Sequence, residues 1–451
     1  EFRVSLGIPA GVDDLTLGFS STLTTSGDEA SYAIDDLSLD QAGSLSINSL
    51  NTTTPLTINA AAGINLTGDI TGESLSLNTA RLTSAADATT VNGTSNLNLN
   101  LSAAAGSPNL NAFTLQSAAL NLSSPTGGRF RIDTPDLTVK TNEALTLTQA
   151  APQPSTSLSL ASGSADFSFS VQGDLNIASL TAGAGSIALA SDQGDITLAQ
   201  ASQPLTGTLR LTADAGSITT APASNINLGD LIADASGDIN LTLNQLGSFS
   251  SSNNDPNAST TLNASSPSSV AINTLSTAGS ALISNNLAGG LSISDPAALS
   301  TRDLHLNSAG PIAISTEQST TLNAAYNLRL EATEFITDRS ALTLSTTAGD
   351  NQTWINISNP TLADALELPL IESSHLIIES DSGVRFSADA FSSQQIDHPF
   401  SSISFVRPRS SSDDIVVRHP YRQDSQLLRS ASGIAYAVDD DRQNNSRNLI
   451  T

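Results

Sequence analysis

The sequence contains no cysteine and no methionine among its 451 residues. The absence of cysteine excludes a disulfide framework, a thiolate zinc site, an iron–sulfur cluster and a thiol nucleophile. Both side chains are readily oxidised, so a chain that lacks them favours a protein that works outside the cell. Because the chain begins with Glu1 and not with methionine, we also expect that a signal segment was removed or that the chain is part of a longer precursor.

Basic side chains are also scarce. Lys and Arg number 17 against 43 Asp and Glu, which gives a formal net charge of −26. Recognition of nucleic-acid phosphates needs clustered Lys and Arg, so this balance excludes an ordinary nucleic-acid binder and argues against docking on an anionic membrane. The chain has no run of about 18 apolar residues, so we expect no transmembrane helix.

A short apolar–polar–apolar unit recurs along most of the chain, written largely in Leu, Ile, Ser, Thr, Asn and Ala. Alternation of period two predicts strands with one buried face and one wet face, and we expect each strand to hold three to five residues. The clearest units are Leu45-Ser-Ile47, Leu56-Thr-Ile58, Leu75-Ser-Leu77, Leu97-Asn-Leu99, Ile187-Ala-Leu189, Leu209-Arg-Leu211, Ile239-Asn-Leu241, Leu304-His-Leu306, Leu328-Arg-Leu330 and Ile355-Asn-Ile357.

Glycines set the spacing of these units. The predicted structural turns are Gly185, Gly194, Gly207, Gly216, Gly229 and Gly237. Equivalent glycines at 185, 207 and 229 recur every 22 residues, a period typical of a solenoid in which short strands become stable by stacking coil on coil. The sequence therefore predicts an all-β, right-handed parallel β-helix of about 22 residues per coil, with glycine supplying a positive φ at each corner. Residues 40–360 would give roughly 15 coils, and we expect Ile187, Leu209 and Leu231 to stack in one inward ladder.

The segments 185–198 and 207–219 carry this pattern most regularly, and they resemble filamentous-haemagglutinin-type exoproteins. Proteins of that family are large β-helical adhesins of Gram-negative bacteria, exported by two-partner secretion. The resemblance covers roughly residues 40–360, but the Asn-rich motifs of the family's secretion domain are not found near Glu1. It implies that the chain is an interior or processed piece, or a self-contained relative, located outside the cell or at the bacterial surface.

Composition divides the chain into three parts. Residues 41–363 carry the repeat, residues 1–40 read as an N-terminal strand, capping or contact segment, and residues 364–451 hold longer, more β-branched strands. We expect the last part to form a distinct β-rich C-terminal cap or contact element. Alternating apolar residues in 1–20 favour pairing with a neighbouring copy, so we expect end-to-end or strand-exchange association through 1–20 and 364–451.

No catalytic or cofactor-binding residues are predicted. Adjacent acidic residues occur at Asp13-Asp14, Asp35-Asp36, Asp413-Asp414 and Asp439–Asp441. Neighbours on a strand face opposite ways, so such pairs cannot work as a catalytic dyad unless a turn reorients them. Solvated turn charge is the better interpretation. A carbohydrate-active enzyme should show one wall with a cleft of carboxylates and aromatic residues, whereas a structural protein should show none.

Calcium is the one metal that the sequence suggests, and only weakly. Aspartates lie at corner positions, where stacked coils could align carboxylates; these are Asp69, Asp174, Asp195, Asp230 and Asp238, with the last three as the calcium candidates. Neighbouring corners carry Ser or Thr, and the nonapeptide calcium repeat is absent, which favours solvated corners. The one basic cluster, Arg407, Arg409, Arg418 and Arg422, reads as a surface ion-pair patch.

We expect a non-catalytic extracellular structural protein, either an adhesive stalk on a cell surface or the subunit of an extracellular fibre. Its partners would be other copies of itself and a host surface or glycan. The alternative is a carbohydrate-active β-helix enzyme, similar to a polysaccharide lyase or glycosidase.

Overall fold

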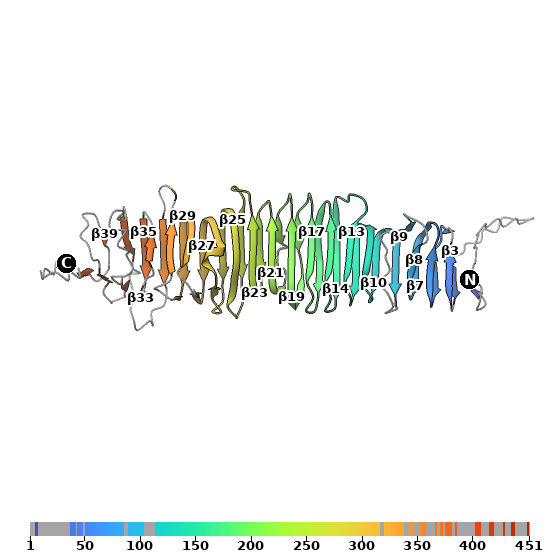
Figure 1. The fold of residues 1–451 in the computed structure, drawn as a ribbon, viewed down its shortest axis with the longest axis horizontal. Coiled ribbons are helices and arrows are strands. Elements are labelled where there is room, and N and C mark those ends of the chain that lie inside the picture. Colours follow the sequence, from blue (N-terminus) through green and yellow to red (C-terminus); the bar gives the residue numbers. More distant parts are fainter. Residues whose placement is uncertain are drawn as a thin grey trace, which may run out of the picture. The chain divides into compact units, whose positions relative to one another are not determined.

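The computed structural model describes most of the repeat region and shorter segments on either side of it. With full side-chain detail it covers residues 38–40, 43–47, 50–84, 89–102, 113–201, 205–315, 321–336, 342–346, 348 and 352–356; in other strand segments, from 5–7 to 449–450, it gives the backbone alone. The described residues form a parallel β-solenoid of about 14 turns with coils of about 21 residues, consistent with the predicted right-handed β-helix. Figure 1 shows the stacked strands of each part.

The chain divides into two units, Glu1–Gly216 with Thr220–Ile226, and Ser217–Thr219 with Asn227–Thr451. The strands of the first unit are β1 (Ser5–Gly7), β2 (Leu37–Gln41), β3 (Ser44–Ile47), β4 (Leu50–Asn51), β5 (Leu56–Ala60), β6 (Gly63–Leu66), β7 (Ile70–Thr79), β8 (Leu82–Ser84), β9 (Thr89–Leu101), β10 (Phe113–Ser124), β11 (Gly128–Asp133), β12 (Asp136–Thr141), β13 (Leu145–Gln149), β14 (Ser155–Ser162), β15 (Phe167–Val171), β16 (Asp174–Thr181), β17 (Ile187–Ser191), β18 (Ile196–Leu198) and β19 (Ala201–Ala213).

The second unit continues with the same kind of strand and one short 3₁₀ helix. Its elements up to the end of the repeat, the first two shared in part with the first unit, are β20 (Ile218–Thr220), β21 (Ile226–Ala235), β22 (Ile239–Leu243), β23 (Gln245–Asn253), β24 (Ser259–Ala264), β25 (Val270–Asn285), β26 (Leu291–Ile293), η2 (Pro296–Ala298), β27 (Leu299–Ser308), β28 (Pro311–Ile314), β29 (Thr320–Ala332), β30 (Glu334–Thr337), β31 (Leu342–Thr346) and β32 (Gln352–Ile357). Among the described residues, no helix is long and apolar enough to cross a membrane.

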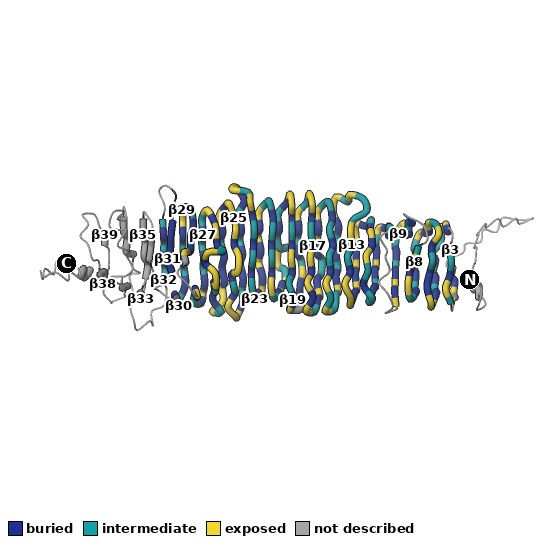
Figure 2. Tube along the Cα trace, in the orientation of Figure 1, coloured by how far each residue is buried: buried dark blue, intermediate teal, exposed yellow. Residues whose placement is uncertain are grey.

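Strands stack through parallel pairing with the equivalent strand of the next coil. In the first unit β13, β15, β17 and β19 pair in succession, so Phe167 lies opposite Ile187, and Ile187 opposite Leu209. All three side chains are at most 1% exposed. Burying each such side chain contributes about 1.5–3 kcal/mol, and the inward ladder repeats this gain at every coil. Figure 2 shows the resulting alternation of buried and exposed positions along each strand.

The outward face of the first unit carries a hydrogen-bonded ladder of amides. Asn59 donates to Asp40 at 2.6 Å, Asn78 to Asn59 at 2.7 Å and Asn100 to Asn78 at 2.7 Å. Each residue lies directly opposite its partner in the parallel register. Identical side chains can bond in this way because parallel in-register stacking puts the amide oxygen of one coil beside the amide nitrogen of the next.

The expected strand length is wrong for part of the chain. Several strands hold ten or more residues, and the longest, β25, holds 16. These strands continue around a corner, where the register shifts, as between Gly72 and Ser74 in β7 and between Thr277 and Ser280 in β25. The alternation in β7 breaks at the same point, with Glu73 and Ser74 both facing outward. A β-bulge thus turns the chain without ending the ladder.

The reason given for the corner glycines is also wrong. Positive φ angles among the described glycines occur at Gly127, Gly128 and Gly290, and at none of the six predicted turns. At Gly207 an added Cβ would overlap the carbonyl oxygen of Gly185, and at Gly216 it would overlap that of Gly194. Glycine is needed there because successive coils approach too closely for a side chain. Equivalent statements hold at Gly185 and Gly194, whose added Cβ would overlap backbone atoms of the preceding coil.

Both chain ends lie largely outside the described residues. The predicted contact segment 1–20 includes only β1, which pairs in parallel with β2. Beyond the repeat the backbone strands are β33 (Leu366–Glu367), β34 (Leu370–Glu372), β35 (His375–Ser380), β36 (Val384–Arg385), β37 (Ser402–Val406), β38 (Ile415–Arg418), β39 (Leu427–Leu428), β40 (Ile434–Ala437) and β41 (Leu449–Ile450). Strand β35 pairs in parallel with β32, and β37 with β35, whereas β40 and β41 pair antiparallel. The predicted boundaries at 40 and 363 stay predictions.

Candidate functional site

A cluster of charged, amide and aromatic side chains lies on the outward face of the second unit. We call it the His305 face, and it consists of Asp303, His305, Asn327, Arg329, Glu331 and Trp354, carried by β27, β29 and β32. These residues are far apart in the sequence, and the parallel register joins them. His305 lies opposite Arg329, and Arg329 lies opposite Trp354, so the three form one row across three coils.

Alternation along the strands makes this row point outward. Leu304 and Leu306 flank His305, and Leu328 and Leu330 flank Arg329; all four leucines are at most 1% exposed. The inward side chains anchor each strand in the core. The polar residue between them is therefore held against the surface of the sheet with its backbone fixed on both sides.

Ion pairs link the row to Glu331. The Nε2 atom of His305 lies 2.8 Å from the Glu331 carboxylate, and Arg329 forms an ion pair with the same carboxylate. The guanidinium of Arg329 also stacks on the Trp354 ring, 3.6 Å from its centroid. One guanidinium thus satisfies a carboxylate and an aromatic face at once, an arrangement that a planar delocalised cation favours.

Burial lowers the pKa of His305 from its ordinary value of 6.5. The Glu331 carboxylate acts in the opposite direction and favours the protonated ring, while the positive charge of Arg329 lowers the pKa further. Desolvation is the largest effect, so His305 is neutral near pH 7. A carboxylate can only accept, so the proton of the neutral ring lies on Nε2, toward Glu331, and Nδ1 is an acceptor.

Asp303 forms the other half of the face. Its two carboxylate oxygens accept hydrogen bonds from neighbouring coils, from Ser280 Oγ at 3.0 Å and from Asn327 Nδ2 at 2.5 Å. Arg302, next to it in β27, lies over the Tyr326 ring at 5.5 Å from the centroid. Tyr326 sits where the register shifts between Thr301 and Asp303 and is 43% exposed. The bend therefore projects a tyrosine and an arginine beside the carboxylate.

A shallow hollow of about 230 Å³ opens beside Asp303 and His305. Its lining comes from four adjacent strands and includes Ser259, Thr261, Ser280, Leu282, Asp303 and His305. The carboxylate of Asp303 is 25% exposed and the imidazole of His305 is 30% exposed, so both can reach a bound molecule.

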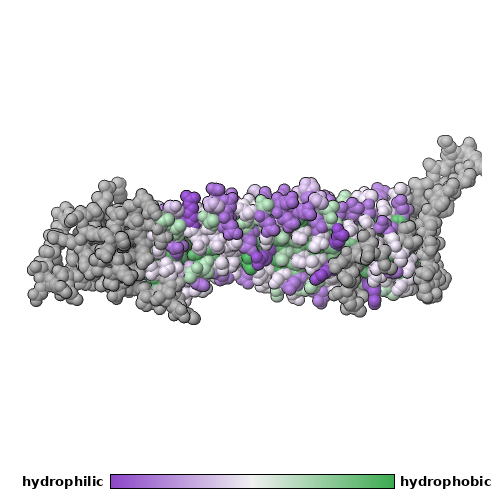
Figure 3. Space-filling model, turned by 45° about the horizontal axis from the view of Figure 1, so that its top comes forward, coloured by the Kyte–Doolittle hydropathy of each residue, from purple (hydrophilic) through white to green (hydrophobic). Residues whose placement is uncertain are grey.

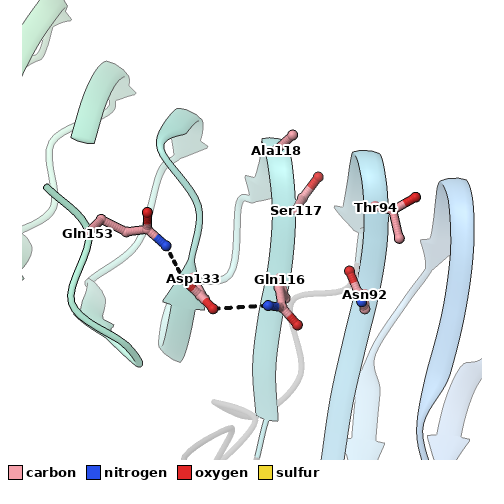
Figure 4. Close-up of a pocket in the computed structure, with 7 residues that line it drawn as sticks. All are labelled: Asn92, Thr94, Gln116, Ser117, Ala118, Asp133 and Gln153. Atoms are coloured by element: carbon pink, nitrogen blue, oxygen red, sulfur yellow. Dashed lines mark hydrogen bonds between the residues drawn. The ribbon is translucent and has the colours of Figure 1, made fainter. Parts of the chain in front are cut away.

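A second hollow, of about 320 Å³, lies on the first unit and is lined by polar side chains. Figure 4 shows Gln116 and Gln153 reaching the Asp133 carboxylate from either side. These bonds satisfy both oxygens of the carboxylate, and Asn92 and Thr94 complete the rim. The hollow carries a single ionisable group, so it offers less varied chemistry than the His305 face.

The corner aspartates act as hydrogen-bond acceptors between coils. Asp174 accepts the backbone N–H of Asp195 at 2.9 Å, and Asp238 accepts the backbone N–H of Ser259 at 2.7 Å and its hydroxyl at 2.9 Å. Asp230 accepts from the Ser248 hydroxyl at 2.7 Å. Within the described residues, no group of three or more His, Cys, Asp or Glu is arranged to hold a metal ion. The structure therefore does not bring the calcium candidates Asp195, Asp230 and Asp238 together as a ligand set.

Other predicted groups fall outside the described residues. These are the acidic pairs at 13–14, 35–36 and 413–414, the acidic run at 439–441 and the side chains of the basic cluster at 407, 409, 418 and 422. Over the described surface drawn in Figure 3, hydrophilic and neutral side chains predominate, with small hydrophobic areas between them. Exposed large apolar residues in the described part are Leu287, Tyr326 and Ile336.

Sequence reasoning missed the His305 face, although the signal was present. Leu304-His-Leu306 and Leu328-Arg-Leu330 have the form of every other strand unit, but their central residues are large and ionisable where most units carry Ser, Thr or Asn. Aligning successive coils would have put these two central residues, and Trp354 after them, in one row. The aspartate candidates drew attention to the corners instead.

No known protein family matches the chain, and neither the curated proteins nor the solved structures include a significant match. The function is therefore inferred from the chain's own residues. The parallel β-solenoid is consistent with a β-helical exoprotein.

Proposed function

We propose that this protein is a non-catalytic structural protein that works outside the cell, as an adhesive stalk on a bacterial surface or as the subunit of an extracellular fibre. The observation that supports this proposal best is the coil-on-coil pairing, in which outward amides such as Asn59 and Asn78 bond directly between coils. A scaffold of this kind gains length by adding coils and presents the same faces throughout. Filamentous-haemagglutinin-type adhesins have this design.

Composition supports the extracellular part of the proposal. Cysteine and methionine are the side chains that oxidants attack most readily, and this chain contains neither. Its net charge of −26 keeps copies apart in solution, so any association needs a specific contact. We place that contact at residues 1–20 and 364–451.

Adhesion can be measured on beads. Beads coated with the full chain should bind to host-cell layers or to glycan-coated surfaces more than beads coated with an unrelated protein of equal charge. Equal binding of the two bead types would contradict the adhesive role. Light scattering of the full chain and of a chain lacking residues 1–20 tests the fibre form, because equally monomeric behaviour of both would exclude association through that segment.

A carbohydrate-active enzyme is the second candidate, and the His305 face is the observation that favours it. Carboxylates and aromatic residues do share one wall there, and His305 is neutral beside Glu331. Against catalysis, Glu331 is already paired with His305 and Arg329, and both oxygens of Asp303 accept bonds from Ser280 and Asn327. Both carboxylates are therefore already held by protein groups, which favours the non-catalytic proposal.

Turnover assays distinguish the two candidates. Pectin, alginate and neutral polysaccharides incubated with the full chain should show no new reducing ends and no new unsaturated ends. Reproducible cleavage that disappears in both His305→Gln and Glu331→Gln, while Asp174→Asn keeps it, would overturn the non-catalytic proposal.

A further inference from the structure

A step in side-chain size creates the hollow beside the His305 face. Along one outward row, Thr261 lies opposite Leu282, Leu282 opposite His305, and His305 opposite Arg329. At one end of the row the side chain of Thr261 is small and projects little from the sheet. At the other end His305 and Arg329 are large and form a wall. The hollow of about 230 Å³ lies at this step.

The floor of the hollow is apolar and its edges are polar. Leu282 is half-buried and forms the floor, with the Asp303 carboxylate and the His305 imidazole beside it. Binding sites for small molecules combine an apolar surface with a few placed polar groups that fix orientation. A ligand that fits must therefore present an apolar face and polar edges together.

Two polar groups at the edge, Asp303 and His305, offer acceptor atoms. Each Asp303 oxygen takes one hydrogen bond from a neighbouring coil. Oδ2 also lies 3.6 Å from Nε of Arg302, whereas Oδ1 keeps a second lone pair for a ligand. His305 directs its Nε2 to Glu331, which leaves Nδ1 as an acceptor. The lowered pKa of His305 keeps this nitrogen unprotonated near pH 7. Both groups thus accept hydrogen bonds from donors on the ligand, such as hydroxyl groups.

The charges around the hollow disfavour an anionic ligand. Arg329, the cation that lines it, is paired with Glu331 and covered by Trp354. The chain as a whole carries a net charge of −26, which repels polyanions. A neutral ligand with several hydroxyl groups meets no such penalty.

We propose that this hollow binds a neutral pyranose unit within a polysaccharide chain. The C–H face of the sugar ring lies on Leu282, and its hydroxyl groups donate to Asp303 and to Nδ1 of His305. The hollow is shallow and open to solvent, so a sugar unit within a polymer can reach it. This proposal rests on the adhesive role above and names the class of ligand for it.

The test measures binding of neutral oligosaccharides by titration calorimetry, using fragments of glucan, mannan and galactan, with oligogalacturonate and heparin fragments as acidic probes. Asp303→Asn replaces an acceptor oxygen by a donor amide at constant shape, and Thr261→Arg fills the low end of the hollow. Matched controls in the first unit are Asp174→Asn, at another corner carboxylate, and Thr138→Arg, at another exposed strand position. Circular dichroism and urea unfolding show whether each variant folds.

At least one neutral fragment should bind the full chain. Each site variant should bind that fragment at least about tenfold more weakly, because Asp303→Asn removes a hydrogen bond to a charged group and Thr261→Arg fills the space that the sugar needs. Both controls should keep the affinity within about twofold. The proposal is overturned if no neutral fragment binds, if Thr261→Arg binds as the full chain does, or if only the acidic fragments bind.

The same variants separate this proposal from the adhesive role. Beads that adhere equally with the full chain and with Thr261→Arg, while no neutral fragment binds, would remove the site and leave the adhesive role. If the fragments bind in the hollow but beads coated with the full chain do not adhere, the adhesive role is contradicted and the binding site remains.

Discussion

Gly207 stacks directly over the carbonyl oxygen of Gly185 in the preceding coil, at a distance that leaves no room for a Cβ atom. The same relation joins Gly216 to Gly194. At these corners the backbones of successive coils of the first unit approach so closely that only glycine fits.

Replacing Gly207 by Ala should lower the free energy of unfolding by about 1–3 kcal/mol, because the added methyl group overpacks the corner. Urea unfolding followed by circular dichroism measures the change. Gly63→Ala is the control, since its added Cβ would lie 3.0 Å from the flexible Arg81 side chain, and we expect a change of less than about 1 kcal/mol there. Equal losses in the two variants would contradict the corner argument.

Replacing Asn78 by Ala should lower the free energy of unfolding by about 1 kcal/mol, because it removes the donor to Asn59 and the acceptor for Asn100. The same urea experiment measures the loss. Thr57→Ala changes an outward residue of the neighbouring strand β5 and serves as the comparison. A stability unchanged by Asn78→Ala would mean that water replaces the ladder at no cost.

Calcium should leave the stability unchanged. Asp238 already accepts two hydrogen bonds from Ser259, and Asp230 accepts one from Ser248. Thermal unfolding with added calcium and with added chelator should give the same midpoint within error. A midpoint that rises with calcium in the full chain, and no longer rises in Asp238→Asn, would restore the corner metal site.

Stability should fall as the pH drops below 6.5, the ordinary pKa of histidine, in part because of His305. Burial lowers the pKa of His305 in the folded chain, so the unfolded chain takes up its proton first as the pH falls, and this favours unfolding. The contribution of neutral His305 to the free energy of unfolding is complete above pH 6.5. It is lost as the pH falls toward the lower pKa that His305 has in the folded chain. His305→Gln should show a shallower fall in the unfolding midpoint over this range.

Proton NMR tests the direction of the shift itself. The histidine resonance that disappears in His305→Gln should titrate with a midpoint below 6.5 in the full chain. Glu331→Gln should move that midpoint lower still, because the carboxylate raises the pKa that burial lowers. A midpoint above 6.5 would show that Glu331 outweighs desolvation.

The repeat could be predicted because two-residue alternation and glycine spacing are both local in the sequence. Ile187 and Leu209 were expected in one inward ladder, and they lie opposite each other in the structure. Leu231 was expected in the same ladder; it is 1% exposed and lies opposite Phe249. Burial of these positions follows from their place in an apolar–polar–apolar unit.

Corner geometry could not be predicted in the same way. The sequence shows where a glycine occurs but not why glycine is needed there. The close approach of two coils depends on residues 22 positions apart, such as Gly185 and Gly207. The long strands escaped prediction because a bulge at Glu73 and Ser74 turns the chain while the ladder continues.

The candidate site depends on register, and that is why alternation alone did not reveal it. His305, Arg329 and Trp354 meet because 24 and then 25 residues separate them, whereas 20 residues separate Phe167 from Ile187 and 22 separate Ile187 from Leu209. One extra residue is taken up at the corner that carries Tyr326, where the offset between β27 and β29 rises from 23 to 24. A fixed 22-residue period would have placed these side chains on different rows.

Asn59 and Asn78 occupy the same place in successive coils, and this equivalence bears on how the gene can change. Removing the codons for 59–77 would join Ile58 to Asn78, in frame and with every later side chain still facing the way it faces now. Duplicating these codons would likewise leave every later side chain facing the way it faces now. Loss of one codon within a strand, by contrast, would turn the remainder of that strand inside out. Unequal recombination can therefore lengthen or shorten this protein in steps of one coil, about 21 residues, whereas the loss of a single codon within a strand would disrupt the core.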